Sequence, residues 1–192
     1  MNRLRVLFAA ALVTGLSACS TSDIVISGDG PSGLPYDPSY VRYVMGQGDF
    51  PLEIHGNPSP LDDTAFAELV ESTLQIDPYF GTTAFRRDPQ MSNRHGFRLV
   101  LVFNADNTRI DARQVCAGEG LDKAGGANTT LFVRGVFCSL DKVLSEDSAL
   151  TPTPDDFAGP RFERVLDLLV TSLLPPEGRR DLNVTCPTTN CS

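Results

Sequence analysis

The chain has too few basic residues for a nucleic-acid-binding protein. It carries 16 Lys and Arg against 24 Asp and Glu over 192 residues, which gives a formal net charge of −8. An acidic surface repels the phosphate backbone, and the two adjacent basic pairs, Arg86-Arg87 and Arg179-Arg180, are too small to reverse that repulsion. The composition therefore predicts no nucleic-acid partner.

The common catalytic motifs are also missing. The sequence contains no Gly-x-Ser-x-Gly, no Ser-x-x-Lys and no His-Glu-x-x-His segment. Its two histidines, His55 and His95, do not stand at zinc-ligand spacing from any cysteine. We expect no metal and no cofactor, and we assign no catalytic residue. A triad is a spatial arrangement that can form without a motif, and in that case His95, in a polar loop, is the candidate base.

One apolar run stands out, and it is too short to span a bilayer. Val6 to Leu16 is apolar almost throughout, whereas a transmembrane helix needs about 20 residues. The run follows the basic segment Asn2-Arg3-Leu4-Arg5 and precedes Leu16-Ser17-Ala18-Cys19. This order is typical of an export signal, so we expect residues 1–18 to be removed.

The segment Leu16-Ser17-Ala18-Cys19, directly after that run, resembles the lipobox of bacterial lipoproteins. The resemblance implies that the Cys19 thiol receives a diacylglyceryl group, that cleavage falls before Cys19, and that acylation of the new amine leaves the protein anchored to the membrane. In the lipoprotein pattern an Asp directly after the cysteine favours the inner membrane, but here Ser20 follows. The resemblance therefore implies the periplasmic side of the outer membrane. An ordinary secretory signal with a coincidental cysteine is the alternative.

The remaining cysteines form an even set. Once Cys19 is assigned to lipid, Cys116, Cys138, Cys186 and Cys191 are left, in a compartment that favours disulfides. Four cysteines permit three pairings. We favour Cys116 with Cys138, and Cys186 with Cys191 as a small ring that closes the C-terminal tail.

Residues 19–40 are rich in Ser, Gly, Asp and Pro and predict a flexible tether, and residues 41–192 are long enough for one domain. Two helices are expected there, one from Asp62 or Asp63 and one from Pro160. The expected strands are a hairpin of Tyr40–Met45 and Phe50–His55, a marginal strand at 81–87, an interior strand Phe97–Phe103, a strand Leu131–Cys138 and a short edge strand at 143–150. This order predicts an α+β two-layer sandwich, with a mainly antiparallel sheet of about four to six strands and both helices on one face.

The second sheet face needs a cover of its own, because the interior strand is apolar on both sides. On that face the strand Leu131–Cys138 presents Phe132, Arg134 and Val136. The loop at 104–129, the C-terminal segment from Glu177 and a partner protein are the possible covers. We predict that Phe132, Arg134 and Val136 form a face for an envelope partner protein.

The segment Phe97 to Asn104, the loop cysteine and the segment Leu131 to Asp141 are together similar to uncharacterised exported lipoproteins of Gram-negative bacteria, which imply no activity. Two functional hypotheses remain. The first is a non-catalytic binding or assembly module, held at the outer membrane through Cys19. The alternative is an envelope hydrolase that acts on cell-wall or small polar substrates.

The anchor hypothesis predicts that Cys19→Ala abolishes membrane attachment. Stable anchoring requires about two lipid signals, and the variant loses the thiol that starts the acylation. Membrane fractionation should find the Cys19→Ala variant in the soluble fraction. Mass spectrometry of the wild type should find acyl groups on Cys19, the residue that becomes the new N-terminus. A variant that still sediments with membranes, together with an unacylated wild type, contradicts the hypothesis.

Overall fold

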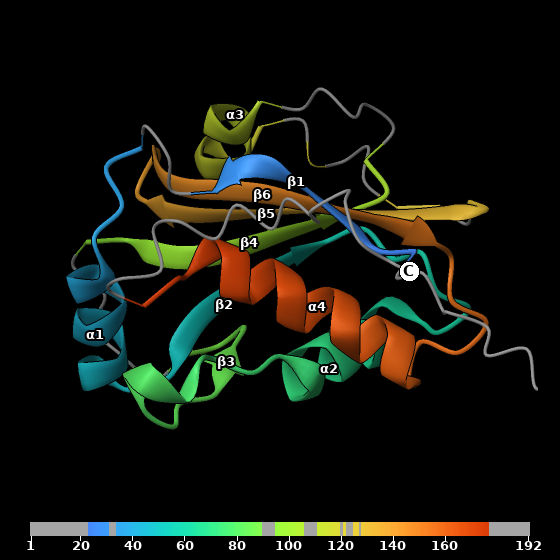
Figure 1. Ribbon diagram of the computed structural model, residues 1–192, viewed down its shortest axis with the longest axis horizontal. Helices are drawn as coiled ribbons and strands as arrows, with labels where there is room; N and C mark the ends of the chain where they lie inside the picture. The colour runs from blue at the N-terminus through green and yellow to red at the C-terminus, as the bar shows by residue number, and fades with distance from the viewer. Residues whose placement is uncertain are drawn as a thin grey trace, which may run out of the picture.

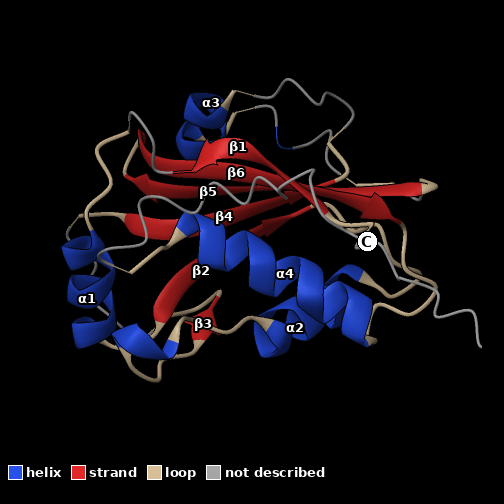
Figure 2. Ribbon diagram, viewed as in Figure 1, coloured by secondary structure: helices blue, strands red, loops and turns tan. Residues whose placement is uncertain are grey.

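The protein folds as an α+β sandwich around a six-stranded mixed sheet, which confirms the predicted fold class. The structure is a computed structural model that describes residues 23–30, 34–89, 95–105, 111–119, 121, 125–126 and 128–176. Helices lie on both sides of the sheet, with α2 and α4 on one side and the small helix α3 on the other (Figures 1 and 2).

The described chain contains six strands, four α-helices and one 3-10 turn. The strands are β1 (Val25–Gly30), β2 (Phe50–His55), β3 (Phe85–Arg86), β4 (Phe97–Phe103), β5 (Thr130–Ser139) and β6 (Lys142–Pro152). The helices are α1 (Pro38–Gln47), α2 (Asp63–Thr73), the 3-10 turn η1 (Pro78–Phe80), α3 (Ala112–Ala117) and α4 (Pro160–Leu173).

The strand order across the sheet is β1-β6-β5-β4-β2-β3. The β1, β6, β5 and β4 strands pair antiparallel, whereas β2 is parallel to both β4 and β3. The apolar strand β4 is therefore interior, as its composition predicts. Its odd-numbered residues face one side of the sheet, which we call the first face, and its even-numbered residues face the other, the second face.

The main core fills the first face. Helices α1, α2 and α4 contribute their apolar sides to it, and the helical spacing predicted for α2 and α4 is confirmed. Asp62 caps α2, since its side chain accepts a hydrogen bond from the Ala65 amide at 2.9 Å. The largest fully buried side chains of this core include Phe50, Phe66, Phe103, Phe137, Phe162, Leu99, Leu101 and Leu169.

A smaller core fills part of the second face, below α3. Helix α3 belongs to the long loop between β4 and β5, and the sequence analysis did not predict it. Its Val115 is fully buried against Val100, Val102 and Val136 of the sheet. The long loop itself is therefore the cover that the second face of the central strands requires.

The predicted hairpin of Tyr40–Met45 with Phe50–His55 is wrong, because the first of these runs lies in α1. Asp37 caps this helix, its side chain accepting from the Ser39 amide at 2.8 Å, and Pro38 occupies the first turn. Val41 and Val44 are fully buried at the i, i+3 spacing of one helix face. The short alternation of Tyr and Val also fits a strand. The helix is favoured because it buries Val41 and Val44 together against the core.

The predicted tether at 19–40 and the predicted edge strand at 143–150 are also corrected. Part of the tether forms the edge strand β1. Ile26 of this strand and Ile24, which directly precedes it, pack against the main core. β1 pairs with β6, which is therefore a long interior strand. A Cβ on Gly28 would lie 2.6 Å from Asp147 Oδ1 and 2.9 Å from Asp147 Cα, so this glycine permits close strand packing.

Gly28→Ala should destabilise the protein, because the added methyl group would displace the β6 backbone at Asp147. Overpacking of this kind lowers the free energy of unfolding by about 1–3 kcal/mol. Urea denaturation of the variant and the wild type measures the difference. The control is Gly46→Ala in α1, where an added Cβ meets nothing within 4 Å and should stabilise by up to about 1 kcal/mol. Equal stability of both variants would argue against the placement of β1.

Candidate functional site

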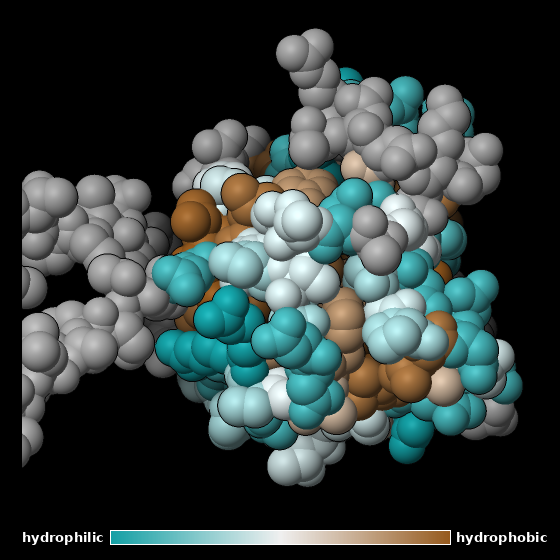
Figure 3. Space-filling view, turned by 90° about the vertical axis from the view of Figure 1, so that its right-hand side faces the viewer, coloured by the Kyte–Doolittle hydropathy of each residue, from teal (hydrophilic) through white to brown (hydrophobic). Residues whose placement is uncertain are grey.

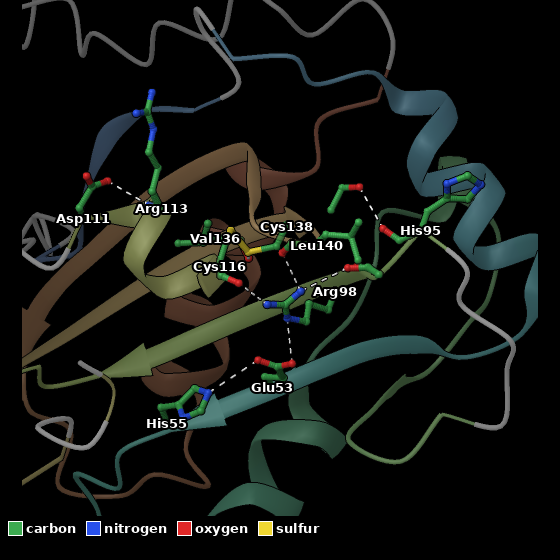
Figure 4. The surroundings of a disulfide bond; sticks show 12 residues. Glu53, His55, His95, Arg98, Asp111, Arg113, Cys116, Val136, Cys138 and Leu140 are labelled. Carbon is green, nitrogen blue, oxygen red and sulfur yellow. Dashed lines mark hydrogen bonds and ion pairs between the residues drawn. A yellow bond between two sulfur atoms is a disulfide. The ribbon is translucent and has the colours of Figure 1, made fainter. Parts of the chain in front are cut away.

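The charged cluster of Glu53, His55 and Arg98 lies on the second face beside the disulfide (Figure 4). Glu53 and His55 come from β2, and Arg98 comes from β4. The neighbouring β2 residues Leu52 and Ile54 point the other way, toward the main core on the first face. The register places Glu53 beside Val100 and His55 beside Val102, so both side chains share the face of Arg98. Strand pairing therefore brings together three charged or titratable groups that are distant in sequence.

Arg98 is the centre of the cluster, and its guanidinium group binds the protein itself. Nη2 donates to the Cys116 carbonyl at 2.5 Å, and Nη1 donates to the Leu140 carbonyl at 2.9 Å and to the Gly96 carbonyl at 3.3 Å. Nε lies 2.8 Å from Glu53 Oε1. These contacts join β4 to β2, to α3 and to the turn between β5 and β6. The guanidinium is therefore not available to bind a carboxylate or phosphate ligand.

Glu53 is held ionised by its neighbours. His55 and Arg98 lower the pKa of the Glu53 carboxyl below its ordinary value of 4.5, while partial burial acts in the opposite direction. His55 Nε2 is 3.8 Å from Glu53 Oε2, too long for a normal hydrogen bond, whereas the Arg98 contact is 2.8 Å. We therefore regard Arg98 as the firmer partner of the carboxylate.

The predicted disulfide between Cys116 and Cys138 is confirmed. It joins α3 to β5 with a Cα–Cα distance of 5.6 Å, and both cysteines are buried. It thus pins α3 over the smaller core next to the Arg98 contact with the Cys116 carbonyl. The other predicted pair, Cys186 and Cys191, lies outside the described residues, as does the lipidation residue Cys19.

The predicted partner face is corrected at Val136. This side chain is fully buried with Cys138 below α3, so it cannot contact a partner. Phe132 and Arg134 are half-buried, and Arg134 Nη2 lies 2.5 Å from Glu146 Oε2 of the neighbouring strand. The sequence pattern identified the sheet face correctly, but the cover over its centre comes from α3.

The two histidines lie in different surroundings, and neither is placed for nucleophilic catalysis. His55 has Glu53 as its neighbour, whereas the His95 ring packs edge-on against Tyr43, with ring centroids 5.4 Å apart. Across the described residues, no hydroxyl or thiol group forms a hydrogen bond with either ring. A hollow of about 230 Å³ is lined by Glu53, Arg87 and Arg98 among others, and neither histidine lines it.

Arg98 is a site residue that was not predicted, although the sequence carries a signal for it. Arg98 is the one charged residue in the apolar strand Phe97–Phe103, and the side chain is only 19% exposed. A charge in such a strand requires partners, because burying an unpaired charge is costly. Which partners it has depends on the pairing of β4 with β2 and on the position of α3, which only the folded chain shows.

The lowered pKa of Glu53 predicts an acid-dependent contribution to stability. A carboxyl whose pKa is depressed on folding stabilises the protein above its ordinary pKa, and that contribution is lost as the pH falls through the folded-state pKa. Wild type should therefore exceed Glu53→Gln in the free energy of unfolding at pH 7, by up to about 1 kcal/mol for this partly exposed pair. The difference should shrink below about pH 4.5.

Urea denaturation across this pH range measures the difference, with Glu68→Gln, exposed on α2, as the control. Glu68→Gln should differ little from wild type at every pH. A Glu53→Gln difference that is independent of pH contradicts the ion-pair assignment.

No family model, no curated protein and no solved structure matches this chain. No activity is therefore transferred from a relative, and the role of the cluster follows from its own contacts. Those contacts are to backbone carbonyls and to a carboxylate of the same chain, which is the pattern of a structural network.

Proposed function

We propose that this chain is a non-catalytic binding or assembly module, anchored by lipid on Cys19 at the periplasmic side of the outer membrane. The observation that carries the proposal is that the charged cluster of Glu53, His55 and Arg98 makes its contacts within the protein itself. Arg98 binds three backbone carbonyls and Glu53. The alternative, an envelope hydrolase, lacks comparable support, since no nucleophile contacts a histidine within the described ranges.

The anchor proposal rests on the lipobox resemblance at Leu16 to Cys19. In the part of the chain that the structure describes, no helix has the length and the apolar composition to cross a bilayer. Ser20 after Cys19 supports the outer membrane as the location.

A surface around α1 offers the better candidate for protein contact. We call it the α1 surface and define it by Arg42, Tyr43, Tyr79 and Leu140. Tyr43, Tyr79 and Leu140 are 38%, 53% and 60% exposed. Arg42 Nη2 donates to the Tyr79 hydroxyl at 2.7 Å and lies over its ring, with Cζ 5.3 Å from the centroid. Tyrosine and arginine are enriched at interfaces because they combine large contact area with directional hydrogen bonds.

The α1 surface takes the role that the sequence analysis gave to Phe132, Arg134 and Val136. Val136 is buried, whereas Tyr43 and Tyr79 of the α1 surface are partly exposed to solvent. A partner protein can therefore bury these rings without rearrangement of the sheet. The partner is an envelope protein, because the proposed anchor confines the chain to that compartment.

Crosslinking in cells should identify this partner, and its affinity for soluble variants should test the α1 surface. Tyr79→Ser and Tyr43→Ser remove exposed aromatic area, so we expect at least one of them to weaken binding about tenfold or more, as hot-spot truncations do. Leu61→Ser is the control, since Leu61 is 42% exposed before the start of α2. If the affinity is unchanged in both tyrosine variants while circular dichroism shows the native fold, the α1 surface is not the contact site.

A further inference from the structure

A row of apolar side chains lies on the second face at the start of β1, outside the part that α3 covers. The register places Val25 beside Leu150 and Leu150 beside Phe132, across β1, β6 and β5. Val25 and Leu150 are 55% and 42% exposed, and Phe132 is half-buried. We call these three residues the β1 corner. Figure 3 views the molecule from the right of Figure 1, the side toward which β6 ends, and shows separate apolar patches among hydrophilic residues on this side.

The β1 corner is close to the proposed lipid anchor. Asp23 lies four positions after Cys19, so the chain from Cys19 spans at most about 14 Å to Asp23 and at most about 22 Å to Val25. Asp23 itself is placed at the surface, with Oδ2 3.6 Å from Arg161 Nη2. Neighbouring strands are about 4.8 Å apart, which puts Leu150 and Phe132 about 5 and 10 Å from Val25.

Because β1 belongs to the sheet, the domain cannot stand far from the membrane. A flexible tether at residues 19–40 would have allowed a separation of about 25 Å. With β1 paired to β6, the end of the sheet that carries Val25 has to stay beside the lipid to which Cys19 is attached. The membrane is therefore the first surface that the exposed apolar row meets.

We propose that the β1 corner docks on the membrane that carries the acyl chains of Cys19. This proposal rests on the proposed anchoring at Cys19. Val25, Leu150 and Phe132 lie at the boundary of headgroups and acyl chains, as the apolar faces of interfacial proteins do. Nearby charge does not favour anionic lipid, since Arg134 is paired with Glu146 and Arg161 with Asp23. A zwitterionic surface is sufficient, because the contact depends on apolar burial.

Docking at the β1 corner also orients the domain. β1 runs from Val25 toward α1, so the α1 surface lies at the other end of β1, and Figure 1 shows α1 at the opposite end of the sheet from the point where β6 ends. The exposed rings of Tyr43 and Tyr79 then face away from the membrane. The anchor and the surface proposed for protein contact therefore occupy opposite ends of the domain.

The absence of tryptophan from the chain allows a direct test. Leu150→Trp and Val25→Trp place a single fluorophore in the β1 corner, and Tyr79→Trp places one at the α1 surface as the matched control. Each mature, acylated protein is reconstituted into phosphatidylcholine vesicles with and without brominated acyl chains. We expect brominated lipid to quench about half of the Leu150→Trp or Val25→Trp emission, because that depth is the acyl boundary. Tyr79→Trp should keep its emission.

The outcomes separate the docking from the anchor. If the acylated proteins float with the vesicles but neither Leu150→Trp nor Val25→Trp is quenched, the docking proposal is wrong and the anchor stands. If the two probes become shielded only when the crosslinked partner protein is added, the β1 corner is a protein interface and the docking proposal is again wrong. If the chain from the membrane fraction carries no acyl group and does not float, the anchor and the docking both fail. Circular dichroism of each variant verifies the fold, and Val25→Trp, at the sheet edge, serves if Leu150→Trp is unfolded.

Discussion

The interior strand β4 has to be covered on both faces, and the rest of the structure depends on this requirement. Leu99 and Leu101 face one side, Val100 and Val102 face the other, and all four are fully buried. Burial of this much apolar area is the main favourable term in folding. Three helices cover the first face, and the loop that carries α3 covers the centre of the second.

Helix α3 is too short to be stable on its own, since isolated helices below about 12 residues are marginal in water. Two contacts hold it on the sheet: the disulfide from Cys116 to Cys138 and the hydrogen bond from Arg98 to the Cys116 carbonyl. With a separation of 22 residues, the loop-entropy model gives the disulfide about 3 kcal/mol. The cluster of Glu53, His55 and Arg98 that resembles a reactive site is thus part of the support of α3.

The edge strand β1 links the fold to the proposed location. A segment rich in glycine and serine would normally separate a domain from its anchor, but pairing with β6 makes it part of the domain. With the proposed anchor, the end of the domain at Val25 is proximal to the membrane and the end at α1 is distal. A binding module of the proposed kind, fixed in this way, would present the α1 surface to a partner in one orientation, which would reduce the entropy lost on binding.

The sequence by itself determined the features that depend on local pattern. The apolar run of β4 and the helical spacing in α2 and α4 are readable from neighbouring residues, and the structure has both. The pairing of Cys116 with Cys138 is one of three that the sequence permits, and the structure has this one. Only the tertiary structure decided the placement of β1, the helical state of α1, the burial of Val136 and the partners of Arg98. Each of these depends on a contact between segments distant in sequence. Gly28 illustrates the difference, because a glycine that suggests flexibility locally is required by its contact with Asp147.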